Sequence, residues 1–93
     1  MRAAVFALTD GGAALAARLC AVLDGEAQLY LPERLNGSTP TAGHTAYFAH
    51  LSAAMTTAFS RYDALVCVMA TGIVVRTLAP CVRSKLYDPA VIV

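Results

Sequence analysis

The chain has 93 residues, which is enough for one domain. Hydrophobic residues make up 58% of it and charged residues only 14%, well below the roughly 25% of an average domain, which predicts a compact α/β core or a surface covered by further protein. The net charge of +1 gives no support for nucleic acid as a partner, and the longest apolar stretch, residues 64–75, is shorter than the about 20 residues that span a bilayer.

The first predicted elements are a strand over residues 3–8 and a helix over residues 11–23. The strand is a short apolar run, and the helix follows from apolar residues that recur at helical spacing. Thr9 or Asp10 can cap the helix, because each offers a side-chain oxygen to the free N–H groups of the first turn. Gly25 suits the position after its end.

The middle of the chain predicts a second strand, a loop and a second helix. Residues 28–31 form a brief strand, and residues 36–45 are small and polar and indicate a surface loop. The helix is expected over residues 46–60, with Phe48 among the apolar residues on its buried side. His50 lies off that side and is expected to be exposed.

The third strand, over residues 64–69, is followed by the most informative turn. The run is apolar on both faces, as in a parallel strand covered by helices on both sides. Ala70-Thr71-Gly72 interrupts it, and a short helix over residues 73–79 is expected to end at Pro80. The free N–H groups of such a turn can hold an anion or a carbonyl oxygen, and a side chain at position 72 would strain the turn and block the approach.

Two alternatives remain open at this turn. Residues 73–75 are β-branched, so a strand, a Thr-Gly turn and a second strand would also fit the local pattern. Arg76 lies about one helical turn beyond the glycine and could reach the rim of the anion seat, or it could be an ordinary solvated charge.

The order of elements, with a last strand over residues 90–93, predicts an α/β fold. It is a small, open, Rossmann-like parallel sheet with helices on both faces and strand order 2-1-3-4. Ligands bind such sheets at the carboxyl ends of the strands, near the switch point, here between the first and third strands. The expected site therefore includes Thr9, Asp10, Gly11 and Gly12 after the first strand, and Ala70, Thr71, Gly72 and Arg76 after the third. The segment after residue 8 does not match GxGxxG, so a dinucleotide site is weakly supported.

Several stretches resemble the amino-terminal part of the CbiG family, the cobalt-precorrin-5A hydrolases of anaerobic cobalamin (vitamin B12) biosynthesis. They are Tyr-Asp-Ala-Leu-Val at 62–66, Ala-Thr-Gly-Ile-Val-Val-Arg at 70–76, Ala-Pro at 79–80, and Lys85 with Asp-Pro-Ala-Val at 88–91. Thr9 and Gly12 also fit the opening of that family. The resemblance implies that residues 1–93 form an amino-terminal α/β domain, truncated at its carboxyl end, since in the family a glycine-rich segment follows.

The resemblance also implies a reaction. It is the opening of the lactone ring of cobalt-precorrin-5A, with release of acetaldehyde as the corrin ring contracts. Arg76, Arg83 and Lys85 could pair with the carboxylates of this tetrapyrrole macrocycle. Asp10 or Asp88 could position water, although a helix cap and a turn former are the simpler interpretations. No catalytic group is assigned and no cofactor or metal site is expected, because cobalt enters as part of the substrate.

The alternative function is a non-catalytic module that binds an anionic tetrapyrrole or a nucleotide. Three cysteines without a CxxC pair, and an apolar segment too short for a secretory leader, indicate a cytoplasmic protein without a membrane partner. The last strand is wholly apolar and carries no charge, so we expect a homo-oligomer through this edge or pairing with a missing carboxyl-terminal segment. The 93-residue chain by itself is expected to have little or no hydrolase activity.

Overall fold

The fold is an α/β layer structure built on one parallel sheet. The computed structural model describes residues 2–23, 26–37, 45–83 and 88–93. The strands are β1 (Ala3–Ala7), β2 (Ala27–Pro32), β3 (Thr45–Phe48), β4 (Ala64–Val68) and β5 (Ala90–Ile92), in the spatial order β3-β2-β1-β4-β5. The helices are α1 (Asp10–Val22), α2 (Leu51–Arg61) and α3 (Thr71–Leu78), with single 3-10 turns η1 (Glu33–Leu35) and η2 (Ala79–Cys81).

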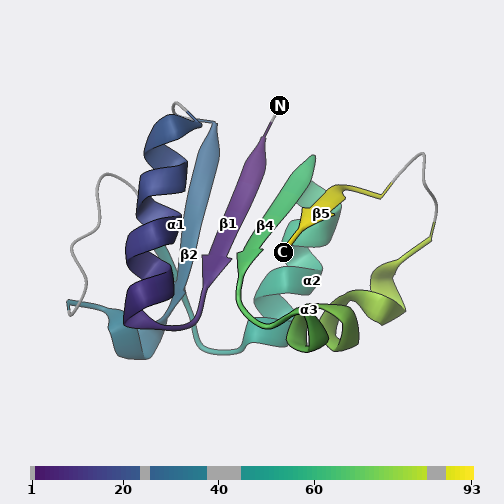
Figure 1. Ribbon diagram of the computed structural model, residues 1–93. Helices are drawn as coiled ribbons and strands as arrows, with labels where there is room; N and C mark the ends of the chain where they lie inside the picture. The colour runs from purple at the N-terminus through teal and green to yellow at the C-terminus, as the bar shows by residue number, and fades with distance from the viewer. Residues whose placement is uncertain (1, 24–25, 38–44, 84–87) are drawn as a thin grey trace.

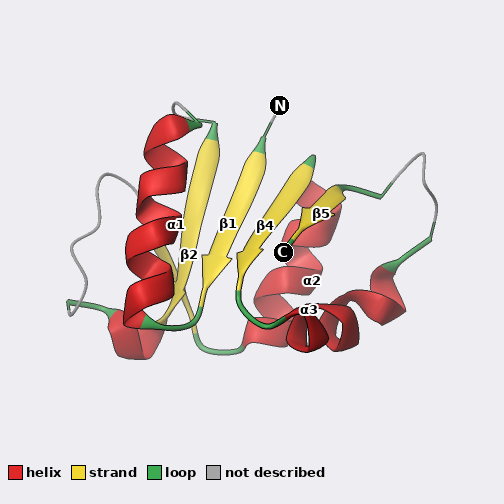
Figure 2. Ribbon diagram, viewed as in Figure 1, coloured by secondary structure: helices red, strands yellow, loops and turns green. Residues whose placement is uncertain are grey.

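The two faces of the sheet are covered by different helices, as Figures 1 and 2 show. The central strand β1 is buried throughout and alternates between two cores. Phe6 lies in one core with Met55 of α2 and Val74 of α3, while Val5 lies in the other with Ala13 of α1. This double burial explains why β1 and β4 are almost continuously apolar, and it confirms the predicted α/β class with helices on both faces.

The predicted strand order is wrong in detail, because the sheet contains a fifth strand. The four predicted strands stand as β2-β1-β4-β5, and β3 adds to the β2 edge in parallel, with Leu29 opposite Thr45 and Pro32 opposite Phe48. Phe48 was expected on a helix, yet it ends β3, where its ring centroid is 6.1 Å from that of Phe6. The aromatic and β-branched residues beside Phe48 favour a strand. The pairing of β3 with β2 decides between the helical pattern and the strand pattern.

α1 and α3 begin close to their predicted positions, whereas α2 begins later than predicted. α2 begins only at Leu51, and the exposed His50 precedes it as the N-cap residue, so the predicted exposure of His50 is confirmed. The hairpin alternative at residues 71–72 is wrong, because α3 begins at Thr71. Gly25, Lys85 and residues 38–44 of the predicted loop lie outside the described residues. In the described part of the chain, the helices are too short or too polar to cross a membrane.

Candidate functional site

The loops that follow β1 and β4 leave neighbouring strand ends at the carboxyl edge of the sheet. Ala7 pairs with Val68 at the ends of these neighbouring strands, and both arrowheads point to the same edge in Figure 2. From β1 the chain moves outward to β2 and β3, and it returns to place β4 on the opposite side. Residues 9–12 and 70–72 therefore flank the switch point, a region that we call the switch-point edge.

Thr9 caps α1 at this edge. Its Oγ1 accepts a hydrogen bond of 3.0 Å from the backbone N–H of Gly12, so of the two predicted capping residues it is Thr9 that acts. Asp10 is the first residue of α1 and its charge already complements the positive end of the helix dipole. The first turn of α3 has no acidic residue, so its free N–H groups are the better seat for an anionic ligand.

The glycines at this edge differ in what a side chain would meet. A Cβ at Gly12 would lie 3.1 Å from Thr9 Oγ1 and 3.4 Å from the carbonyl oxygen of Val68, so close packing of α1 against β4 needs a glycine there. A Cβ at Gly72 would have nothing within 4 Å, and the φ of Gly72 is not in the left-handed region. The expectation that a side chain at Gly72 would strain the turn is therefore wrong, whereas obstruction of a ligand stays a prediction.

Arg76 lies at the rim of this edge, as its spacing predicted. Its exposed side chain turns back along α3, and Nε–H donates to the carbonyl oxygen of Gly72 over 3.3 Å. The rest of the guanidinium group retains donors for a carboxylate. The contact holds the positive charge beside the first turn of α3.

A second guanidinium group at this edge was not predicted. Arg34, in η1, donates through Nη2 to the carbonyl oxygen of Leu8, next to the cap residue Thr9. The available signal was its position two residues after Pro32, the last residue of β2, because every parallel strand ends at this same edge. Only the cations between residues 64 and 87 were expected near a ligand, so Arg34 was missed.

Asp88 does not join the other predicted site residues. It precedes β5, whose first residue Ala90 pairs with Ala64 at the start of β4, so Asp88 lies at the opposite edge of the sheet. Its Oδ2 accepts a hydrogen bond of 2.7 Å from the backbone N–H of Arg83. This contact supports the interpretation of Asp88 as a turn former.

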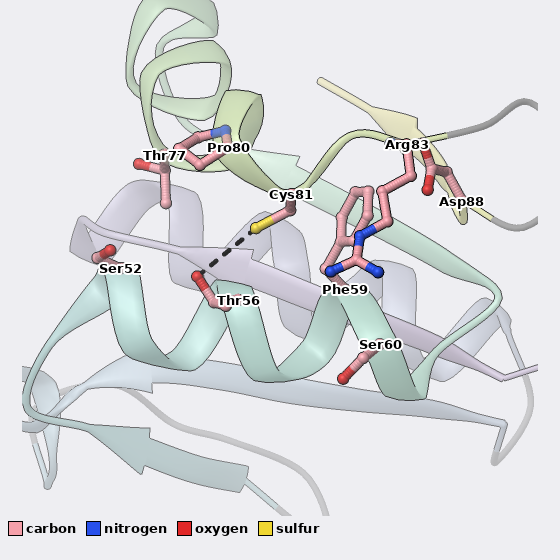
Figure 3. Close-up of a pocket in the computed structure, with 9 residues that line it drawn as sticks. All are labelled: Ser52, Thr56, Phe59, Ser60, Thr77, Pro80, Cys81, Arg83 and Asp88. Carbon is pink, nitrogen blue, oxygen red and sulfur yellow. Dashed lines mark hydrogen bonds between the residues drawn. The ribbon is translucent and has the colours of Figure 1, made fainter.

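Beside Asp88 lies a hollow of about 710 Å³, bounded by α2 on one side and by α3, η2 and the chain beyond η2 on the other (Figure 3). We call it the α2 hollow. Its lining includes Thr56 and Phe59 of α2, Cys81 of η2, and Arg83. None of the predicted residues at the switch-point edge lines it.

The thiols of Cys67 and Cys20 give little sign of nucleophilic chemistry. Burial raises the pKa of Cys67 to about 11 and also raises the pKa of Cys20, so both favour the neutral thiol. Cys67 lies in the core with Phe6 and Leu65. Both cysteines are therefore packing residues, as their apolar surroundings in the sequence predicted.

Comparisons with known proteins agree with the sequence motifs. A family model described as "Cobalamin synthesis G N-terminal" matches residues 53–93, the segment that contains most of α2, β4, α3 and β5. The chain is also 44% identical, over 90 residues, to the cobalt-precorrin-5A hydrolase of Salmonella typhimurium strain LT2. The resemblance to the amino-terminal region of CbiG is confirmed. The aligned residues are 97% of this chain and 24% of that hydrolase, so the CbiG-like chain spans about a quarter of the relative's length. No solved structure matches it significantly.

Proposed function

We propose that this CbiG-like chain takes part in cobalamin biosynthesis by contributing to the opening of the lactone ring of cobalt-precorrin-5A. The observation that carries the proposal is the 44% identity with a protein of that name, which extends over 97% of the chain. In this reaction water adds to the lactone carbonyl carbon, the ring C–O bond breaks, and a two-carbon fragment later leaves as acetaldehyde. The group that activates the water is not assigned.

The role of the switch-point edge is to bind and orient the macrocycle. Arg76 and Arg34 present guanidinium groups near the ends of β4 and β1, where they can pair with peripheral carboxylates of the substrate. The free N–H groups in the first turn of α3, near Gly72, can hold the carbonyl oxygen as negative charge develops on it. Lys85 and Asp88 are further candidates only through the family resemblance.

The same proposal covers the surroundings of the reaction. The protein is cytoplasmic, it takes no cofactor of its own, and its cobalt arrives within the substrate. Neither nucleic acid nor a membrane is a partner. A second copy of the chain, or a carboxyl-terminal segment like the one that follows in the family, covers the exposed residues of β5.

The decisive experiment transplants this chain into the Salmonella hydrolase in place of the 90-residue segment that it aligns with. The chimera should release acetaldehyde from cobalt-precorrin-5A. Arg76→Ala in the chimera should lower kcat/KM about tenfold, the effect expected for a lost hydrogen bond to a charged group. A folded chimera without turnover would contradict the proposal, as would full activity of the Arg76→Ala chimera.

A binding module without chemistry is the second candidate. One observation favours it: among the described residues no polar or charged side chain is buried, so the switch-point edge lacks a desolvated acid or base. Such a module would hold an anionic tetrapyrrole or a nucleotide through its arginines. A chimera that binds the precorrin and releases no acetaldehyde would favour this candidate.

A further inference from the structure

The α2 hollow has the features of a second ligand site, separate from the switch-point edge. Thr56 and Phe59 lie on the wall formed by α2, and Cys81 and Arg83 belong to the wall formed by η2 and the chain beyond it (Figure 3). Its volume of about 710 Å³ leaves room for a small organic molecule, since ligand pockets usually measure about 300–1,000 Å³.

The hydroxyl groups in the hollow differ in what they offer a ligand. The Ser60 hydroxyl donates to the carbonyl oxygen of Thr57 and the Thr77 hydroxyl to that of Ile73, so both hydrogens are engaged within their own helices. Thr56 Oγ1 instead accepts from the Cys81 thiol, with the sulfur 3.8 Å away, and retains its own O–H for donation. Thr56 therefore presents a donor to a ligand that carries acceptor atoms.

Arg83 supplies the positive charge. Its side chain is exposed and extends toward α2 in Figure 3, on the same side as the ring of Phe59. Phe59 is half-buried, and Pro80 adds a second apolar surface to the lining. The hollow thus combines a guanidinium group and a hydroxyl donor with flat apolar walls.

We propose that the α2 hollow binds a small organic monocarboxylate with a flat apolar body. The carboxylate pairs with Arg83 and accepts from the Thr56 hydroxyl, and the apolar body packs on Phe59 and Pro80. Asp88 selects a monoanion over a dianion, because its carboxyl group lines the same end of the hollow and its Oδ2 is bonded to the Arg83 backbone. The proposal does not depend on the switch-point edge or on hydrolase activity.

The experiment is a titration of the ¹⁵N-labelled 93-residue chain with benzoate, followed through its amide chemical shifts. Benzoate should change the amide chemical shifts of Thr56, Phe59, Cys81 and Arg83 until they saturate. The amide shifts of Ala70 to Gly72 should not change. Arg83→Ala should raise the Kd about tenfold, and Thr56→Val should raise it a few-fold while conserving side-chain shape. The matched control is Arg76→Ala, which removes the same guanidinium group from the other edge and should bind benzoate like the parent chain.

Two further ligands test whether binding needs a negative charge and whether it prefers a single one. Benzyl alcohol keeps the ring without the charge and should bind more weakly than benzoate, and phenyl phosphate adds a second negative charge and should also bind more weakly. Non-saturable shifts with benzoate, an unchanged Kd in Arg83→Ala, or tighter binding of either comparison ligand would overturn the proposal. A chain that binds benzoate but fails in the hydrolase chimera would leave this inference standing and contradict only the proposed function.

Discussion

The hydroxyl groups of Tyr30 and Tyr62 lie 2.8 Å apart, between β2 and the end of α2. The ring of Tyr30 stacks on Phe6, with centroids 4.8 Å apart, and meets Tyr62 edge to face. Burial first, and then the hydrogen bond to Tyr62, raise the pKa of Tyr30 from 10.0 to about 12. This pair therefore favours the neutral phenol in the folded state.

We predict a pH dependence of stability from this pair. Because the unfolded tyrosine ionises near its ordinary pKa of 10.0 while the folded one stays neutral, its contribution is complete below pH 10 and is lost as the pH rises towards about 12. An absorbance titration of the phenolates should show one of the four tyrosines ionising late. Tyr62→Phe should bring that step to lower pH, whereas Tyr47→Phe should not. Uniform titration of all tyrosines in the parent chain would contradict the assignment.

Gly12 and Gly72 form a matched pair for substitution by alanine. Gly12→Ala should lower the free energy of unfolding by about 1–3 kcal/mol, because its Cβ meets Thr9 Oγ1 at 3.1 Å and the Val68 carbonyl at 3.4 Å. Gly72→Ala should leave it unchanged or raise it by about 0.5–1 kcal/mol, since this helical position is open. Urea denaturation of both variants measures the difference. Equal losses would show that the two positions are packed alike.

At the scale of elements, local patterns predicted the parts that depend on neighbouring residues. The apolar run before Ala70, the glycine after it and the proline at position 80 were enough to predict β4 and α3. Thr9 could be named as a cap because its hydroxyl acts within one turn. Local chemistry of this kind is visible in a sequence.

The rest depended on contacts between distant residues. Residues 45–48 become a strand because β2 offers them an open edge, which a helical pattern through Phe48 cannot reveal. Arg34 reaches the switch-point edge because η1 follows the end of β2 and its side chain bonds the carbonyl oxygen of Leu8, 26 residues earlier in the chain. Asp88 lies at the edge opposite the predicted site because the pairing register places Ala90 beside Ala64.

The last strand, β5, has features that favour self-association. β5 has only three residues, pairs with β4 alone within the described chain, and leaves Ile92 56% exposed. An apolar edge without charges favours pairing with another chain, so we predict self-association that Ile92→Lys abolishes. Light scattering over a concentration series measures the mass. The control is Val22→Lys, at an exposed site on α1, which should leave the association intact. Ile73→Lys is not a suitable control because Ile73 is half-buried. A parent chain that stays monomeric would contradict the prediction.

At the scale of the molecule, two surfaces offer sites for ligands, and they are lined by different residues. The switch-point edge collects the ends of β1 and β4 with Arg34 and Arg76, and the α2 hollow lies beside α2 with Arg83. The CbiG-like segment 53–93 contributes to both. Ligand binding at one surface can therefore be tested independently of the other.

A titration of the ¹⁵N-labelled chain with cobyrinic acid, a cobalt corrin that carries carboxylates around its ring, tests the macrocycle site directly. We expect saturable amide shifts at Thr9 to Gly12 and Ala70 to Gly72. Arg76→Ala and Gly72→Val should each weaken binding about tenfold, the first through a lost charge-assisted contact and the second through obstruction. Arg83→Ala should bind like the parent chain. Shifts confined to the α2 hollow, or unchanged binding by Arg76→Ala and Gly72→Val, would contradict the assignment of the switch-point edge as the macrocycle site.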